Sequence, residues 1–136
     1  MAIDPTATDN SISAIGLTMD CNDPIRIADF WQAAIGFANR VGTGDPYVTL
    51  SNSPVGRPLN HLTIQRVPES KTAKNRAHLD LFARDHTAEV ERLAHLGAAV
   101  LLAADADREG HLGFLATVMA DPEGHEFCVV SRPPQS

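Results

Sequence analysis

The sequence predicts an α+β protein built from two βαβββ modules, whose strands form a curved mixed sheet around a cavity. The order strand, Asp, helix, Gly and three strands occurs twice, which indicates a duplicated unit. Asp23 and Gly36 bound the helix in the first copy, and Asp85 and Gly97 bound it in the second. Apolar and polar residues alternate in the strand segments, whereas an apolar stripe at helical spacing follows each Asp.

The first module is predicted over about residues 12–67. Its strands are expected at 12–21, 37–41, 47–50 and 61–67. Asp23 is a good N-cap and Pro24 fits the first helical position, so a helix begins here and ends before Gly36. Residues 1–10 have no periodicity, and we expect them to be flexible.

The second module is predicted over about residues 76–131. Its strands are expected at 76–83, 98–103, 114–120 and 126–131. Asp85 caps a helix that runs to Leu96, and 121–124 form a tight turn. We expect a flexible tail at 132–136. One domain over residues 1–136 is the simplest organisation, because a chain of 136 residues buries one sizeable core.

Charge and hydropathy exclude several classes of partner. The net charge is −6, with 11 basic and 17 acidic residues, which disfavours nucleic acid and anionic membranes. No apolar stretch reaches the roughly 18 residues of a membrane span, and no secretory signal pattern begins the sequence. We therefore expect a cytoplasmic protein, with Cys21 and Cys128 as buried free thiols rather than a disulfide.

Strand alternation predicts which residues line the cavity. Those expected to face it are Gly16, Thr18, Asp20, Thr63, Gln65, His78, Asp80, Glu126 and Cys128. Of these, we assign Asp20, Thr63, Gln65, Glu126 and Cys128 as candidate ligand-binding residues. The alternative is that these polar side chains form the solvated face of an antiparallel sheet.

His78 and Asp80 are the candidate catalytic residues. They lie two positions apart on one strand face, so Asp80 could orient His78 or accept its proton in general acid–base chemistry. The alternative is structural, with His78 held in a hydrogen bond and Asp80 paired with Arg76.

Several segments, in this order, resemble one known superfamily. They are "MDCNDPIRIADFWQAAIGF", "VPESKTAKNRAHLDL", "AEVERLAHLGA" and "MADPEGHEFCVV". Together they span about residues 15–130 and resemble the glyoxalase-like domains of the glyoxalase/bleomycin-resistance/dioxygenase (vicinal-oxygen-chelate) superfamily. The resemblance implies a pocket for a small molecule and a homodimer. It also implies either an enzyme of lyase, isomerase or dioxygenase type, or a non-catalytic protein that sequesters a drug or metabolite.

The same resemblance implies a divalent metal such as Zn, Ni, Mn or Fe. The family's ligand positions, carried over one by one, fall near Gly16, near Gln65 or Thr63, on His78, and near Cys128. Glu126 lies two residues from Cys128 on the same face and could substitute for it, so His78 and Glu126 are the candidate metal ligands. This set is incomplete, because a catalytic site generally needs three protein ligands. The third would have to be Asp80, Asp20 or Gln65.

Overall fold

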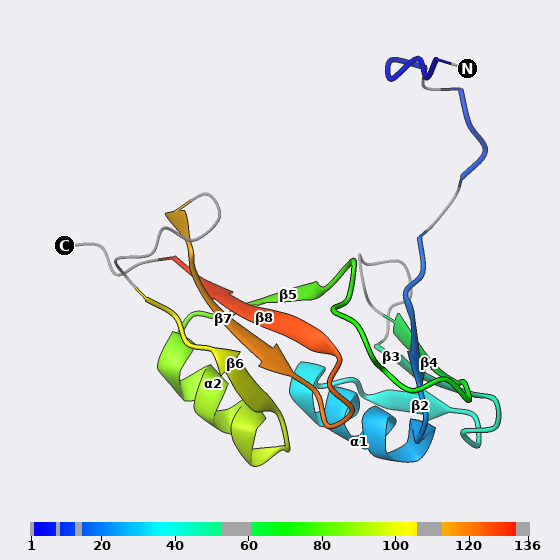
Figure 1. The fold of residues 1–136 in the computed structure, drawn as a ribbon. Helices are drawn as coiled ribbons and strands as arrows, with labels where there is room; N and C mark the ends of the chain where they lie inside the picture. The colour runs from blue at the N-terminus through cyan, green and yellow to red at the C-terminus, as the bar shows by residue number, and fades with distance from the viewer. Residues whose placement is uncertain (1, 8, 13–14, 53–60, 106–112, 133–136) are drawn as a thin grey trace.

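The computed structural model describes residues 2–7, 9–12, 15–52, 61–105 and 113–132. The segments 51–60 and 104–113, which separate predicted strands, and the predicted tail at 132–136 fall largely outside these residues. Within the described ranges, no helix has the length and apolar character needed to cross a bilayer. Figure 1 shows residues 2–7 and 9–12 lying away from the two sheets.

The first module forms a four-stranded mixed sheet with one helix, as the sequence predicts. Its elements are β1 (Thr18–Cys21), α1 (Pro24–Ile35), β2 (Asn39–Val41), β3 (Tyr47–Ser51) and β4 (His61–Arg66). The order across the sheet is β1-β4-β3-β2, with β1 parallel to β4. β1 is shorter than predicted, because its register with β4 begins only at Thr18 and Thr63. The preceding Ile15 is 85% exposed.

The second module repeats this arrangement. Its elements are β5 (Leu79–Phe82), α2 (His86–His95), β6 (Ala99–Leu102), β7 (Leu115–Ala120) and β8 (Glu126–Ser131). The order is β5-β8-β7-β6, and β5 is parallel to β8. Both β1 and β5 are therefore edge strands of their sheets. The two-module prediction is confirmed, and the strands divide into two separate sheets of four (Figure 1).

The core lies between the helices and the inner faces of the sheets. Its largest fully buried side chains include Trp31, Ile27, Leu50, Ile64 and Phe127. Apolar residues that alternation along the strands turns toward the helices form part of this core. Met19, Phe127 and Val129 are buried, and Leu17, Leu79 and Leu81 pack against the core while partly exposed. The opposite faces of both sheets point away from the helices.

Trp31 of α1 joins the two modules. Its indole Nε1 donates a hydrogen bond of 3.0 Å to Oδ2 of the buried Asp121, 90 residues later in the chain. Its ring also contacts Phe30 and Phe127 edge-on, with both centroid distances 5.1 Å. An edge-on aromatic pair and a hydrogen bond to a carboxylate each stabilise more than apolar burial alone.

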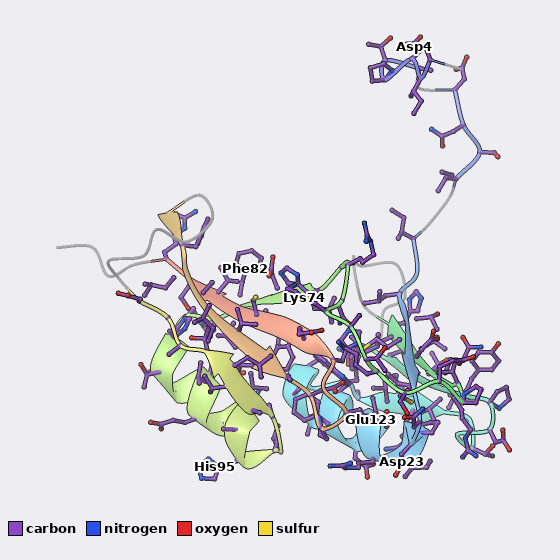
Figure 2. All side chains as sticks on the ribbon, in the orientation of Figure 1. Asp4, Asp23, Lys74, Phe82, His95 and Glu123 are labelled. Atoms are coloured by element: carbon purple, nitrogen blue, oxygen red, sulfur yellow. The ribbon has the colours of Figure 1, made fainter. Side chains whose placement is uncertain are left out.

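Two further contacts join the modules at opposite ends of α1. The Glu123 carboxylate accepts hydrogen bonds of 2.7 Å from the backbone N–H groups of Asn22 and Asp23, at the N-terminal end of α1 (Figure 2). A negative charge there is favourable, because the N-terminus of a helix carries partial positive charge. At the other end, Arg92 of α2 donates to the carbonyl oxygens of Ala33 and Ala34.

His86, at the start of α2, is bonded at both ring nitrogens. Nδ1 lies 2.9 Å from Ser131 Oγ, and Nε2 lies 2.7 Å from Thr117 Oγ1. Ser131 Oγ donates to the carbonyl of Ala83, and Thr117 Oγ1 accepts from the N–H of Ala104. The first bond leaves Ser131 to accept from Nδ1–H, and Thr117 can then donate its hydroxyl hydrogen to an unprotonated Nε2. The network therefore fits neutral imidazole.

Trp31→Phe should lower the free energy of unfolding by about 3 kcal/mol. The substitution removes the indole N–H and leaves a buried carboxylate oxygen of Asp121 with one donor fewer. Urea unfolding measures the change. Tyr47→Phe is the matched control, since it removes an exposed aromatic polar group and should change the free energy by less than about 0.5 kcal/mol. Equal effects of the two substitutions would contradict this role for Trp31.

Stability should fall between pH 7.5 and pH 5.5, and His86 should contribute to the fall. Burial lowers the pKa of His86 below its ordinary value. The folded state therefore binds fewer protons than the unfolded chain, so this stabilisation is present above about pH 6.5 and is lost as pH falls through the folded pKa. His86→Gln should flatten the pH dependence of the urea midpoint, whereas His95→Gln, at the exposed end of α2, should not. An unchanged slope in His86→Gln would reject the assignment.

Candidate functional site

Three of the predicted site residues converge on the outer face of the second sheet. His78 Nε2 lies 3.1 Å from Asp80 Oδ1. One potential ligand atom from each of His78, Asp80 and Cys128 lies within 4.8 Å of the other two. We call these three residues the donor cluster. The structure therefore brings the two predicted catalytic residues together with one predicted ligand-binding residue.

The sheet register explains this convergence. β5 and β8 are parallel neighbours, and Asp80 lies directly beside Cys128. Neighbouring residues in register point to the same face of a sheet, and His78 is two positions from Asp80. The His78 and Asp80 side chains are 39% and 47% exposed, whereas Cys128 is 9% exposed. A ligand can therefore approach the imidazole and carboxylate from solvent, with the thiol beneath them.

Both cysteines are free and buried, as predicted. Burial raises the pKa of the Cys128 thiol, and the Asp80 carboxylate raises it further, while Lys74 opposes the change. Burial also raises the pKa of Cys21, on the inner face of β1, to about 12, with four nearby carboxylates adding to the effect. Neither cysteine is thus a thiolate nucleophile at neutral pH by itself.

Glu126, the other candidate metal ligand, is occupied by structural contacts. Its carboxylate accepts a hydrogen bond of 3.1 Å from Lys71 Nζ and another of 3.1 Å from the backbone N–H of Asn75. Burial opposes ionisation, but these donors outweigh it and hold the pKa of Glu126 below its ordinary value. Within the described residues, the three-donor group contains Cys128 and does not contain Glu126.

The remaining predicted residues, Asp20, Thr63 and Gln65, lie on the first sheet. Asp20 is beside Gln65 in the register of β1 and β4. Thr63 Oγ1 lies 3.1 Å from Thr49 Oγ1, and Gln65 Nε2 lies 3.4 Å from the Tyr47 hydroxyl. They form a polar outer face on that sheet and do not join the donor cluster.

One cavity lies along the edge strand β5 and another along the edge strand β1. The first, of about 640 Å³, has Asp80 and His61 in its lining, together with apolar residues that include Leu17, Phe37 and Leu81. The second, of about 700 Å³, has Asp20 and the segment from Glu69 to Ala77 in its lining. Such volumes accommodate small organic ligands, and the first lies within reach of the donor cluster through Asp80.

His61 is a functional candidate that the sequence analysis missed. A Cβ placed on Gly16 would lie 3.0 Å from its Nε2, so the imidazole fills the space that a side chain at residue 16 would need. His61 also shares the first cavity with Asp80. Alternation along β4 places it on the face of Thr63 and Gln65, which is the feature that could have identified it.

The chain is similar to known proteins in both sequence and fold. The family profile described as the glyoxalase-like domain matches residues 16–130. A glyoxalase-related enzyme from Fulvimarina pelagi is 22% identical, with a TM-score of 0.63 over 92% of this chain and 94% of that one. A glyoxalase/bleomycin resistance protein/dioxygenase family enzyme from Burkholderia phytofirmans is 14% identical, with a TM-score of 0.66 over 86% and 96%.

A fosfomycin resistance protein from Mesorhizobium loti is also similar, at 14% identity and a TM-score of 0.64 over 89% of this chain and 92% of that one. Identities this low show a shared fold and do not establish a shared activity. No curated protein matches the sequence. Because the family profile spans most of the chain, including both modules, this protein belongs to the glyoxalase-like domain family.

Proposed function

We propose that this protein acts on a small oxygenated metabolite, with a divalent metal ion held by His78, Asp80 and Cys128. The observation that supports the proposal is the convergence of an imidazole, a carboxylate and a thiol within 4.8 Å on one sheet face. The reaction we favour is of the lyase or isomerase type, because a set that includes a thiolate suits zinc better than the iron of a dioxygenase.

The donor set fits such an ion. In a tetrahedral zinc site, ligands about 2.0–2.3 Å from the metal lie about 3.3–3.8 Å from one another. The separation of 3.1 Å between His78 and Asp80 is just below this range, and the limit of 4.8 Å across the group is about 1 Å above it, so binding would draw the three side chains slightly closer together. Three protein ligands leave a fourth position open, as in catalytic rather than structural zinc sites.

The residues of this chain would then have distinct tasks. A divalent ion would supply Lewis-acid stabilisation of negative charge on a substrate oxygen. With one Asp80 oxygen on the ion, the other could take or return a proton at a substrate carbon in the cavity of about 640 Å³, whose lining includes Asp80. Leu17, Phe37 and Leu81 give that cavity an apolar wall, against which the carbon skeleton of a ligand would pack.

The alternative function is non-catalytic binding of a drug or metabolite. Gly16 has no side chain for ligation, and the Glu126 carboxylate already binds Lys71 and Asn75. An apolar cavity with few polar anchors is sufficient for sequestration. Under this alternative, the protein binds its ligand equally well in the presence and absence of metal.

A homodimer and a cytoplasmic location remain part of the proposal. The homodimer is supported by exposed apolar side chains on β6, where Val100, Leu101 and Leu102 are 46%, 55% and 49% exposed. A contiguous exposed apolar strand of this kind is often covered by a partner. We also propose that residues 1–136 fold as a single domain.

Purified protein reloaded with Zn²⁺ should retain close to one ion per chain after dialysis. His78→Ala and Cys128→Ser should each lower the affinity at least about tenfold, because each removes one of three ligands. Elemental analysis measures the metal content. Substitution with Co²⁺ should produce a thiolate-to-cobalt charge-transfer band that Cys128→Ser abolishes.

His95→Ala is the matched control for this experiment, because His95 lies on α2 away from the donor cluster (Figure 2). It should leave the metal content unchanged. Absence of metal in the wild-type protein, or equal metal content in wild type and His78→Ala, would reject the metal-assisted function in favour of binding alone.

Asp80→Asn should lower the pKa of Cys128 in the metal-free protein, because it removes the carboxylate that adds to the effect of burial. The rate of iodoacetamide alkylation of Cys128 at pH 8, followed by mass spectrometry, should rise roughly three- to tenfold. Cys21 should not interfere, since its pKa is about 12. Asp20→Asn, a carboxylate change on the other sheet, should leave the rate unchanged. A slower reaction in Asp80→Asn would contradict this electrostatic coupling.

A further inference from the structure

Two phenylalanines and two arginines gather on the outer face of the second sheet, past the donor cluster. β5 and β8 are parallel, and Phe82 lies beside Val130. Arg84 and Arg132 come two positions later, just past the ends of these adjacent strands, and both line the same cavity as Phe82. Phe114 immediately precedes Leu115, which pairs with Ser131, and the register therefore places it across from Arg132.

The two rings form an open aromatic surface. Their centroids are 6.0 Å apart with an interplanar angle of 77°, the edge-to-face arrangement that aromatic pairs prefer. Phe82 is 74% exposed, and it stands on the side of the sheet away from the helices (Figure 2). Because the Phe82 ring is exposed, another flat apolar group can pack against this pair.

This region carries local positive charge although the protein has a net charge of −6. Arg132 Cζ lies 6.0 Å from the centroid of the Phe114 ring, within cation–π range. Within the described part of the chain, neither Arg84 nor Arg132 forms an ion pair. Both guanidinium groups are therefore available to an anion.

The nearest carboxylates on the same strand and helix already have partners. Asp80 is held by His78, and Asp85 accepts a hydrogen bond from the N–H of Ala88 at the start of α2. These contacts hold one carboxylate at His78 and the other at the first turn of α2. The described lining of the cavity beside the two rings contains both arginines and no carboxylate, which favours an anionic ligand.

A cavity of about 280 Å³ lies at this place. Its described lining is Phe82, Ala83, Arg84, Phe114, Val130, Ser131 and Arg132, and none of these residues is acidic. We call it the aromatic pocket. The volume is small, close to the lower limit of ligand pockets, and it suits a ring with a short substituent.

We propose that the aromatic pocket binds the carboxylate end of an aromatic acid. The ring packs against Phe82 and Phe114, and the carboxylate accepts hydrogen bonds from Arg84 and Arg132. Guanidinium and carboxylate form strong, charge-assisted hydrogen bonds of this kind. The combination of aromatic surface and paired arginines selects an aromatic anion over a neutral ring or an aliphatic acid.

The position of the aromatic pocket also indicates which class of substrate would reach the donor cluster. Asp80 lies two positions before Phe82 on the same face of β5, or about 7 Å along the strand. An aromatic acid that carries a further group beyond its ring would extend that group past Phe82 toward Cys128 and His78. The proposal that the pocket binds the acid does not depend on the proposed function. Only the identity of the acid as the substrate rests on that function.

The test uses the full chain with 2-naphthoate and its uncharged analogue 2-naphthamide, followed by calorimetry and by backbone NMR shifts. Naphthoate should bind at least about tenfold more tightly than naphthamide, and added salt should weaken its binding. The largest shifts should lie at Phe82, Phe114 and Arg132. Arg132→Gln should weaken naphthoate about fivefold or more and leave naphthamide unchanged, whereas Phe82→Ala should weaken both.

Arg66→Gln, at the end of β4 on the other sheet, is the matched control and should have no effect. Three outcomes would each overturn the proposal. They are equal affinities for naphthoate and naphthamide, NMR shifts confined to the cavity of about 640 Å³, and no saturation at millimolar naphthoate. His78→Ala separates the two hypotheses. Metal retained by His78→Ala together with naphthoate binding rejects the metal-assisted function alone, whereas loss of metal in His78→Ala without naphthoate binding by the wild-type protein rejects the aromatic pocket alone.

Discussion

The rest of the structure depends on the buried Asp121 carboxylate at the junction of the modules. It accepts hydrogen bonds from Trp31 Nε1 and from the backbone N–H groups of Glu123 and His125. A buried carboxylate is tolerated only when its lone pairs are satisfied, so these donors act as one unit. They fix the turn that leads into β8, and therefore the position along β8 at which Cys128 lies beside Asp80. The junction in the core thereby positions the donor cluster on the surface.

The local features of the fold are predictable from the sequence because their causes are local. α1 occupies the predicted residues, since Asp23 caps Arg26 N–H at 3.2 Å and Gly36 adopts the left-handed conformation with φ of 86°. The inward positions follow from alternation for the same reason. The ends of the edge strands cannot be predicted from alternation, because β1 and β5 begin where pairing with a neighbouring strand begins. That register joins residues about 45 positions apart, such as Thr18 and Thr63.

The sequence predicts which candidate residues lie close together where they share a strand, and it does not where a distant segment intervenes. His78 and Asp80 are two positions apart, so alternation alone places them together. Glu126 and Cys128 lie on the same face of β8 by the same rule, yet they have different surroundings. Lys71 and Asn75, from the segment between the modules, cover Glu126 and leave Cys128 beside Asp80. Periodicity carries no information about which segment crosses a strand, so the choice between these two residues required the structure.

The outer face of the second sheet is chemically polarised along its strands, and this polarity would orient a ligand. His78, Asp80 and Cys128 lie toward one end of β5 and β8, whereas Arg84 and Arg132 lie beyond the other end. A carboxylate near Asp80 would meet like charge, while the same group near the arginines would meet opposite charge in a pocket that Phe82 and Phe114 partly desolvate. The two ends therefore favour one direction of a bound aromatic acid over the reverse. Orientation of this kind needs no contact with the reacting atoms, because electrostatics and ring packing at the far end would bring the same part of each ligand to the donor cluster.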